Sequence, residues 1–404
     1  MAHPRPGAVV ALDATTGALR WSVKSLPAAP DLLAELDGRL VDEGAAACGG
    51  GTGELDAFDA ATGRHLWASP EELGGYPGTV RVGAAVANPP IVVIADSQSP
   101  PSGGVVATPP GGTAPLGAVR GLDVATGRTR WKTPFGATAV EQSGATAVAS
   151  TGSELAALDV ATGAILWRIP VAAGPGGPLI AEHTVVIGAT QNGVDGSVGS
   201  QFVQGFDLRD GRLRWRVSVS PGQVAITAAA GVVVIEEPGA PQLTGTIAPK
   251  PTGPNAGAYT PTGPAALRGV DAATGEPRWS VDLNAAALGF AVGPDASQIA
   301  AGDGIAVLPL ANGRVGAFSL ADGSRRWTTR VPGLGGPDAG PHGVRSLSVG
   351  NGRVAAGGVN VVAALDAATG RLQWRYSFGT VGAVFSGERV YAAAVGALAH
   401  CTPD

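Results

Sequence analysis

The sequence predicts an all-β fold: an eight-bladed β-propeller of four-stranded antiparallel sheets, closed by N- and C-terminal strands that share one blade. Eight tryptophans each lie four residues after a glycine, and seven of them lie eight residues after an aspartate. Successive tryptophans are 36 to 64 residues apart, a spacing typical of arrays such as propeller blades. The tryptophans are Trp21, Trp67, Trp131, Trp167, Trp215, Trp279, Trp327 and Trp374. The aspartates are Asp13, Asp59, Asp123, Asp159, Asp207, Asp271 and Asp366, with Ser319 in the remaining copy.

Each copy is interpreted as a β-hairpin. In the first, the apolar run before Asp13 indicates a strand, and the segment from Gly17 to Trp21 starts a second one. The aspartate can accept backbone N–H groups just ahead of it, and the glycine supplies a positive φ between the strands. Copies spread around a ring cannot all serve one active site, so the aspartates are interpreted as turn caps rather than acid–base groups.

The segments between hairpins leave room for two more strands per copy, for example 138–144 and 145–151 before the strand at 154–159. We name the four strands A to D, so that the aspartate turn joins C to D. One such sheet buries too little surface to be stable alone, so the copies must stack. Radial stacking around an axis protects the strand edges that an open stack would expose.

The two ends of the chain predict ring closure. The chain begins at a C strand near Ala8 and finishes with segments like strands A and B, at 382–385 and 388–392. The first blade is therefore expected to combine both ends, within a single domain over residues 1–404. The tail at 397–401 leaves an alternative open, because it resembles a vestigial C strand.

Composition excludes some classes of protein. The net charge is −5 with no basic run, so nucleic-acid binding is not expected. No stretch of eighteen apolar residues predicts a transmembrane segment, and no signal peptide opens the chain. As written the chain is expected to be cytoplasmic, or extracytoplasmic if it lacks an upstream segment. Cys48 and Cys401 are the only cysteines, and either a disulfide or two buried thiols is compatible with them.

The repeated unit Ala-Leu-Asp-x-x-Thr-Gly-x-x-x-Trp resembles the pyrroloquinoline-quinone (PQQ)-like repeat of quinoprotein dehydrogenase-type eight-bladed propellers. The resemblance covers essentially the whole chain. It implies that all eight tryptophans are docking residues packed between neighbouring blades. The family includes enzymes and non-enzymes; its members are commonly exported or tethered to a membrane, and propeller sensor modules of this fold are fused to bacterial kinases. The chain is thus compatible with being part of such a larger protein.

Three long inserts identify the face where a partner is expected. Ser97 to Gly117, Pro238 to Gly263 and Gln191 to Ser200 all fall between strands B and C, so all three should emerge on one face. Long loops on one face of a scaffold are where binding tends to occur. The alternative is that these Pro- and Gly-rich inserts are tolerated decoration without a partner.

Polar residues end the strands that lead into these inserts. Asp96, Gln191, Asn192, Glu236 and Glu237 could together offer oxygen ligands to a hard cation such as calcium. The alternative is that they are solvated residues at strand ends. Asp295 and Asp303 flank the inner strand of blade seven and are further candidates, directed toward the channel. The five histidines show no metal-ligand spacing, and no catalytic motif appears.

The function favoured by these observations is a non-catalytic scaffold that binds a protein, peptide or glycan partner through its B–C loops, without a cofactor. The alternative is a PQQ- and calcium-dependent alcohol or sugar dehydrogenase. The resemblance implies that such enzymes carry long inserts over the cofactor and, in many members, an adjacent pair of cysteines. This chain has no adjacent cysteines and nearly minimal blades.

Overall fold

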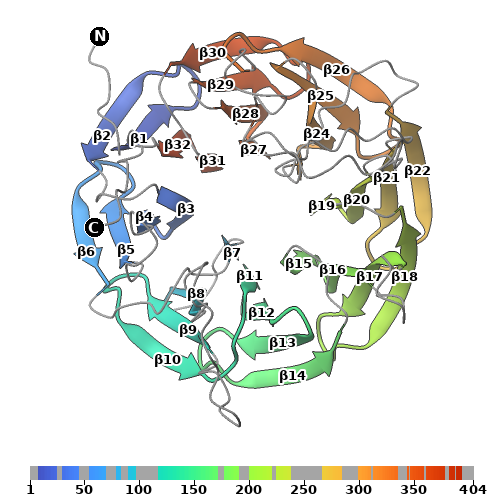
Figure 1. The fold of residues 1–404 in the computed structure, drawn as a ribbon. Coiled ribbons are helices and arrows are strands. Elements are labelled where there is room, and N and C mark those ends of the chain that lie inside the picture. Colours follow the sequence, from blue (N-terminus) through green and yellow to red (C-terminus); the bar gives the residue numbers. More distant parts are fainter. Residues whose placement is uncertain are drawn as a thin grey trace, which may run out of the picture.

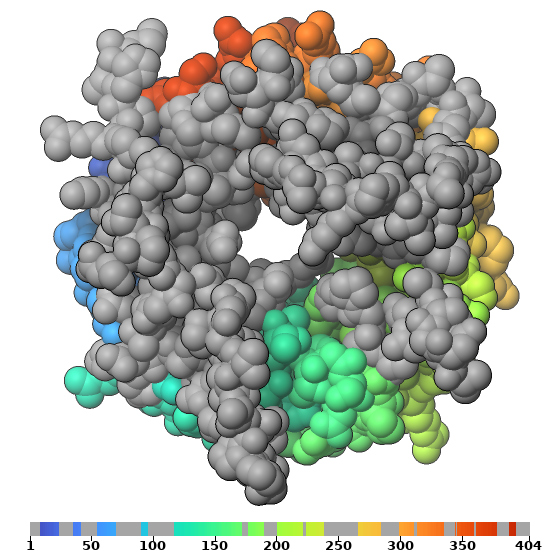
Figure 2. All heavy atoms as spheres, in the orientation of Figure 1, coloured from blue at the N-terminus to red at the C-terminus, as the bar shows by residue number. Residues whose placement is uncertain are grey.

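The structure is a computed structural model, and its eight sheets form a ring around a central opening (Figures 1 and 2). It describes residues 8–24, 30–44, 54–69, 79–82, 90–96, 117–171, 177–190, 200–220, 224–237, 266–283, 299–310, 313–334, 344, 346–358, 361–377, 382–386 and 388–393. Cys48, Cys401 and the tail at 397–401 lie outside these residues. No helix long and apolar enough to cross a membrane occurs in the described part of the chain. The predicted all-β, eight-bladed architecture is confirmed.

In six of the eight blades, strands A to D follow one another in chain order from the centre outward (Figure 1). Blade two is β3 (Pro30–Leu36), β4 (Arg39–Gly44), β5 (Glu54–Asp59) and β6 (His65–Ala68). Blade four is β11 (Ala139–Ser143), β12 (Thr146–Ser150), β13 (Glu154–Asp159) and β14 (Ile165–Pro170), and blade five is β15 (Leu179–Ala181), β16 (Thr184–Thr190), β17 (Gln201–Asp207) and β18 (Leu213–Val219). Blade six is β19 (Ala225–Ala229), β20 (Val232–Glu237), β21 (Ala266–Asp271) and β22 (Pro277–Asp282). Blade seven is β23 (Ala300–Gly302), β24 (Ile305–Leu310), β25 (Arg314–Ser319) and β26 (Arg325–Arg330), and blade eight is β27 (Ser346–Gly350), β28 (Arg353–Gly358), β29 (Val361–Asp366) and β30 (Leu372–Tyr376).

Blade one closes the ring as predicted. Its inner strands are β31 (Gly382–Ser386) and β32 (Arg389–Ala393), and its outer strands are β1 (Ala8–Asp13) and β2 (Leu19–Lys24). Strand β1 pairs antiparallel with β32 over five residue pairs, from Val9 opposite Ala393 to Asp13 opposite Arg389. The two ends of the chain are therefore joined by backbone hydrogen bonds within one sheet.

Blade three departs from the four-stranded pattern at its innermost strand. Strands β8 (Ile91–Asp96), β9 (Ala118–Asp123) and β10 (Thr129–Thr133) form a three-stranded sheet, whereas β7 (Thr79–Val82) pairs in parallel with β11 of blade four. The fully buried side chain of Gln142 bonds the exposed edge of β8: its Oε1 accepts from the N–H of Val93 at 3.0 Å, and its Nε2 donates to the carbonyl of Ile91 at 2.9 Å. One side-chain amide thus occupies ladder positions that an A strand would otherwise fill.

The hydrophobic core lies between blades. Each of the eight junctions has its own cluster of buried apolar residues drawn from the two sheets that meet there. Strands B and C face a neighbouring blade on both sides, and all six residues of β20 are buried. This two-sided burial explains why the strands carry continuous apolar runs rather than strict alternation.

Two sides of the ring follow from this topology. The A–B turns and the C–D turns lie at one end of the blades, which we call the C–D side. The B–C and D–A connections lie at the other end, which we call the B–C side. The three longest B–C connections leave from the ends of β8, β16 and β20, so all three start on the B–C side.

Candidate functional site

Every tryptophan indole contacts the next blade. Each Nε1 donates a hydrogen bond of 2.8–3.1 Å to a backbone carbonyl in the C–D turn of the following blade. In the order of the tryptophans from Trp21 to Trp374, the acceptor carbonyls belong to Ala60, Val124, Val160, Leu208, Ala272, Leu320, Ala367 and Ala14. The last of these contacts joins blade eight to blade one, and we call this junction the seam. The N–H of the same acceptor residue donates to the carbonyl just before strand B of its own blade, as in Leu320 to the carbonyl of Gly304 at 2.9 Å. The backbone of one residue in the C–D turn therefore connects that turn to the start of strand B through its N–H and to the preceding blade through its carbonyl.

Glycine is required where the indole face meets the next C–D turn. Gly370 has a φ of +70°, and a Cβ built on it would lie 2.4 Å from Cδ2 of Trp327. The residue paired with each tryptophan in the hairpin is small for a related reason: a Cβ on Gly121 would lie 2.2 Å from Cε2 of Trp131. Both contacts fall far inside van der Waals distance, so the indole occupies the space that a side chain on either glycine would need.

The motif aspartates cap their turns, as predicted. Oδ1 of Asp13 accepts from the N–H of Thr16 at 2.8 Å and from its hydroxyl at 2.9 Å, and the guanidinium of Arg20 bonds Oδ2 at 2.5 Å. The hydrogen bond from Arg20, with those from the turn, holds the pKa of Asp13 well below its usual range. A carboxylate whose oxygens are used in this way is a structural group rather than a proton-transfer group.

The copy with Ser319 preserves the same chemistry by moving the carboxylate. Oδ1 of Asp322, three residues later, accepts from the N–H of Ser324 at 3.0 Å and from its hydroxyl at 2.7 Å. Hydrogen bonds from Ser324, and one from Ser319, lower the pKa of Asp322 to about 2. The exception in the sequence is therefore an exchange of positions within one turn.

At the B–C side, Glu237 ties the base of the 238–265 connection to blade five. Its Oε2 accepts from the N–H of Ser220 at 2.8 Å, and its Oε1 pairs with the guanidinium of Arg268. Arg268 in turn donates to the carbonyl of Ser218 at 2.7 Å. Because Glu237 ends β20 and Arg268 lies near the start of β21, both ends of this connection are fixed against β18 (Leu213–Val219).

Glu236 points to the opposite side of β20, toward blade seven. It is in line with Val232 and Val234, which pack in the cluster between blades six and seven. The side chain is 2% exposed, and its Oε2 has no hydrogen-bond partner among the described residues. Desolvation by burial raises its pKa to about 8, so the native protein holds a neutral carboxylic acid here at pH 7.

These carboxylates do not fit a calcium ion. Adjacent strand residues face opposite ways, so Glu236 and Glu237 do not converge, and Glu237 is already used by Arg268 and Ser220. Within the described ranges no group of three or more His, Cys, Asp or Glu residues is placed to hold a metal. Gln191, Asn192 and Asp295 lie outside those ranges, as does the placement of the Asp96 side chain at the end of β8.

Asp303 is separated from the other candidates. It occupies the A–B turn of blade seven on the C–D side, whereas Glu236 and Glu237 end a B strand on the B–C side. Its Oδ2 accepts from the N–H of Gly352 in the A–B turn of blade eight, at 2.8 Å. The residue is therefore engaged in a contact between neighbouring turns.

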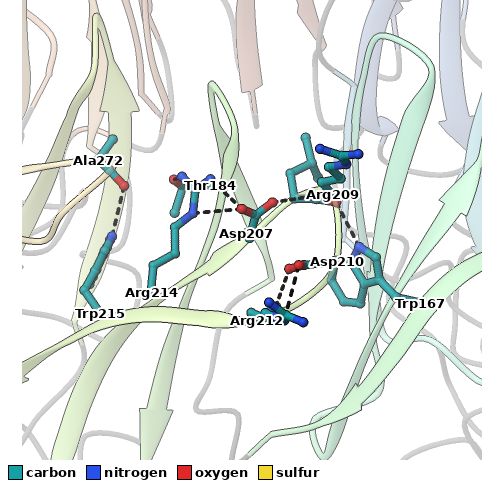
Figure 3. A network of polar contacts seen from close by, with 10 residues as sticks. Trp167, Thr184, Asp207, Arg209, Asp210, Arg212, Arg214, Trp215 and Ala272 are labelled. Atoms are coloured by element: carbon teal, nitrogen blue, oxygen red, sulfur yellow. Dashed lines mark hydrogen bonds and ion pairs between the residues drawn. The ribbon is translucent and has the colours of Figure 1, made fainter.

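The C–D side carries two hollows that the sequence analysis did not anticipate. One, of about 590 Å³, lies over the turns of blade five and is lined by residues that include His183, Thr184, Arg209 and Arg214. Figure 3 shows Arg214 directed at Asp207 and Thr184, with bonds of 2.6 Å to Asp207 Oδ2 and 3.2 Å to Thr184 Oγ1. The other, of about 610 Å³, lies at the seam between blades eight and one. A signal for both was available, because each coincides with a departure from the repeat, at Arg209 and at Thr15.

Comparisons with known proteins agree on the fold. The PQQ_2 family, described as outer membrane protein assembly factor BamB, matches residues 4–111, 116–246, 222–339 and 311–401. Similar solved structures include BamB from Moraxella catarrhalis, with a TM-score of 0.54 and 15% identity over 90% of this chain and 96% of that chain. A comparison with curated proteins gives no match.

Two solved enzymes share the fold as well. A quinohemoprotein alcohol dehydrogenase from Comamonas testosteroni has a TM-score of 0.50 and 14% identity, over 99% of this chain and 78% of that chain. The quinohemoprotein alcohol dehydrogenase ADHIIG from Pseudomonas putida HK5 has a TM-score of 0.52 and 14% identity, over 96% of this chain and 71% of that chain. At these identities the likeness establishes architecture alone.

Proposed function

The chain belongs to the PQQ_2 family, and from this premise we propose that it is a non-catalytic scaffold that binds a protein or peptide partner on the B–C side of its ring. The observation that carries the proposal is the family match over nearly the whole chain, to a description that names an assembly factor. A protein partner is the class of ligand that this description favours.

The arrangement of the connections supports the B–C side. The three longest B–C connections start there, at the ends of β8, β16 and β20. Glu237 and Arg268 anchor the ends of the 238–265 connection to blade five, so a partner that binds this connection is coupled to two blades at once. Variable connections on a repeated framework are a common basis for specific recognition.

The second candidate is a PQQ- and calcium-dependent alcohol or sugar dehydrogenase, which the two solved dehydrogenases favour by fold. When bound, such a quinone would accept the electrons removed from the substrate. The described carboxylates on the B–C side do not provide the converging oxygens that a calcium ion needs, and this disfavours the second candidate.

Two experiments separate the candidates. The first places a photo-crosslinking amino acid at Ser102 or Gln242, in two of the long connections, and at Ala321 in a C–D turn as the matched control. Crosslinking in the source cells to one defined protein from the first two positions, and not from Ala321, supports the scaffold. The purified partner should then bind this protein and lose that binding when residues 240–262 are replaced by a short Gly-Ser linker.

The second experiment tests for an enzyme directly. The purified protein is incubated with PQQ and calcium, desalted, and examined for retained quinone absorbance and for dye reduction with alcohols and sugars. Retained quinone with turnover would replace the scaffold by the dehydrogenase. Crosslinking that is equal at all three positions would argue against the B–C side.

A further inference from the structure

The eightfold repeat provides an internal standard for what the fold alone requires. Two residues after the motif site, six copies carry alanine: Ala61, Ala125, Ala161, Ala273, Ala321 and Ala368. The two exceptions are Thr15 in blade one and Arg209 in blade five. These exceptions line the two hollows on the C–D side, one each. Alanine suffices for the turn, so the larger side chains must be explained by other contacts.

Arg209 contributes an exposed guanidinium to the hollow over blade five. Its backbone N–H donates to Oδ1 of Asp207 at 2.7 Å, but its exposed guanidinium has no hydrogen bond or ion pair with any described residue. The neighbouring Arg214 is fully engaged by Asp207 and Thr184 (Figure 3). That engagement holds one wall of the hollow in place and leaves the Arg209 guanidinium available to a ligand.

The seam hollow shows the contrasting case. There Arg353 donates to the hydroxyl of Thr15 at 2.9 Å and to the carbonyl of Asn351 at 3.3 Å, and Asp13 and Glu388 also line the space. The guanidinium of Arg353 is thus hydrogen-bonded within the protein, and the other charged residues that line this hollow are acidic. Of the two hollows, only the one over blade five presents a guanidinium, that of Arg209, which makes no hydrogen bond or ion pair with a described residue.

The rest of the lining indicates what accompanies the charge. Leu166, which is 54% exposed, lines the hollow from blade four, and Ala272 and Ala273 line it from the C–D turn of blade six. His183 and Glu182 lie on the A–B turn of blade five, and Glu182 sits beside Gly231 of the blade-six turn. Their acceptor atoms can receive N–H groups of a peptide backbone, and a guanidinium matches a carboxylate as a planar two-point fork.

We propose that the hollow over blade five is a second binding site, which takes a peptide carboxylate on Arg209 with a neighbouring apolar side chain against Leu166. The carboxylate comes from an acidic side chain or from a free C-terminus. The site lies on the opposite side of the ring from the connections invoked above, so it does not depend on the proposed function of that face.

Calorimetric titration of the full chain at low salt tests the proposal with three acetylated octapeptides. The first contains a Leu-Glu pair and ends in an amide, the second lacks acidic residues and ends in a free leucine carboxylate, and the third has neither carboxylate. We expect one of the first two to bind and the third not to, and which of the two binds identifies the source of the carboxylate.

Variants locate the binding. Arg209→Ala should weaken it at least about tenfold, because a charge-assisted bond is lost. Arg209→Lys, which keeps the charge without the fork, should give an intermediate loss. The matched control is Arg212→Ala, because Arg212 is 86% exposed, lies in the same turn, pairs with Asp210 and does not line the hollow. It should change the affinity less than about twofold.

Several outcomes would overturn the proposal. These are no binding of either carboxylate peptide at millimolar concentration, equal binding of the neutral peptide, and an equal loss with Arg212→Ala. Displacement by inorganic phosphate at the same concentration as the peptide would overturn the assignment to a carboxylate. Unchanged circular dichroism melting of both variants confirms that the comparison is between folded proteins.

Discussion

The contact between Trp327 and Gly370 allows a sharp test of how the blades are joined. A methyl group on Gly370 would lie 2.4 Å from the indole, and the residue has a φ of +70°. The ring would have to move away by more than an ångström, which would break the 2.8 Å hydrogen bond from Nε1 to the carbonyl of Ala367. Gly370→Ala should therefore lower the free energy of unfolding in two ways: through the strained backbone of an alanine with a positive φ, and through displacement of the indole. Only the second contribution depends on the tryptophan.

The two costs can be given magnitudes. An alanine in the left-handed region costs about 1–2 kcal/mol, and displacement of a packed side chain about 1–3 kcal/mol more. Trp327→Ala alone should cost about 3–5 kcal/mol. In the double variant the displaced ring is absent, so Gly370→Ala should add only the backbone cost. The two substitutions should therefore be non-additive, with a coupling energy of about 2 kcal/mol.

Equilibrium urea denaturation followed by circular dichroism measures the four free energies of unfolding. Gly38→Ala is the matched control, because Gly38 has a φ of +69° with no atom within 4 Å of a built Cβ. It should cost the backbone amount alone, about 1–2 kcal/mol, in both the wild type and the Trp327→Ala background. Additivity of Trp327→Ala and Gly370→Ala within about 0.5 kcal/mol would refute the argument that the indole rests on this turn.

Three further predictions concern single side chains. Native Glu236 keeps its proton up to about pH 8, whereas the unfolded chain loses it near the ordinary value of 4.5, so stability falls as pH rises through this window. The free energy of unfolding of Glu236→Gln, measured by urea titration, should therefore rise relative to wild type between these pH values, by at most roughly 5 kcal/mol, and should not differ from it below pH 4. A difference that does not change with pH would exclude burial of the ionisable group. The pKa of Asp271 is lowered to about 2 by Arg278, so its contribution is present above the unfolded value and is lost as pH falls toward 2. Asp271→Asn should thus be destabilised at pH 7 but not at pH 2 in thermal melts, and an equal deficit at both would contradict this. Gln142→Leu removes both bonds to β8, so the amide of Val93 should exchange hydrogen faster while amides in blade six are unchanged; unaltered exchange at Val93 would show that the edge is held by another group.

Much of this architecture was accessible from the repeat itself. Eight copies show the same spacing of glycine and tryptophan, and seven of them the same spacing of aspartate, so a deviation in one copy does not obscure the pattern. This agreement predicts the hairpin, the C–D turn and the sharing of blade one by both chain ends. The role of the motif aspartates also followed, because a short carboxylate ahead of a Thr-Gly pair has few alternatives. Ser319 needed the structure, since only the observed bonds of Asp322 show that the carboxylate has moved within the turn.

Features that break the repeat were harder to predict. The parallel pairing of β7 with β11 depends on a long-range contact in which the Gln142 amide replaces a strand, and no local propensity encodes that exchange. The sequence groups Glu236 and Glu237 as candidate ligands because both end the strand that leads into an insert, although strand alternation implies that they face opposite ways. Arg209 is the one arginine at an alanine position of the repeat, but the sequence alone does not show the hollow that it lines.

The direction of the indole contacts has a consequence for assembly. Each blade inserts its tryptophan into its successor and never the reverse, so the seal between blade eight and blade one is head-to-tail. Because β30 runs on into β31, the ring can open only where β1 leaves β32, and this would part Trp374 from the C–D turn that holds Gly17. Two opened copies could exchange the β1–β2 hairpin through the same β1–β32 pairing and Trp374 contact that close a single copy, so we expect loss of closure to favour exchanged dimers or longer head-to-tail chains.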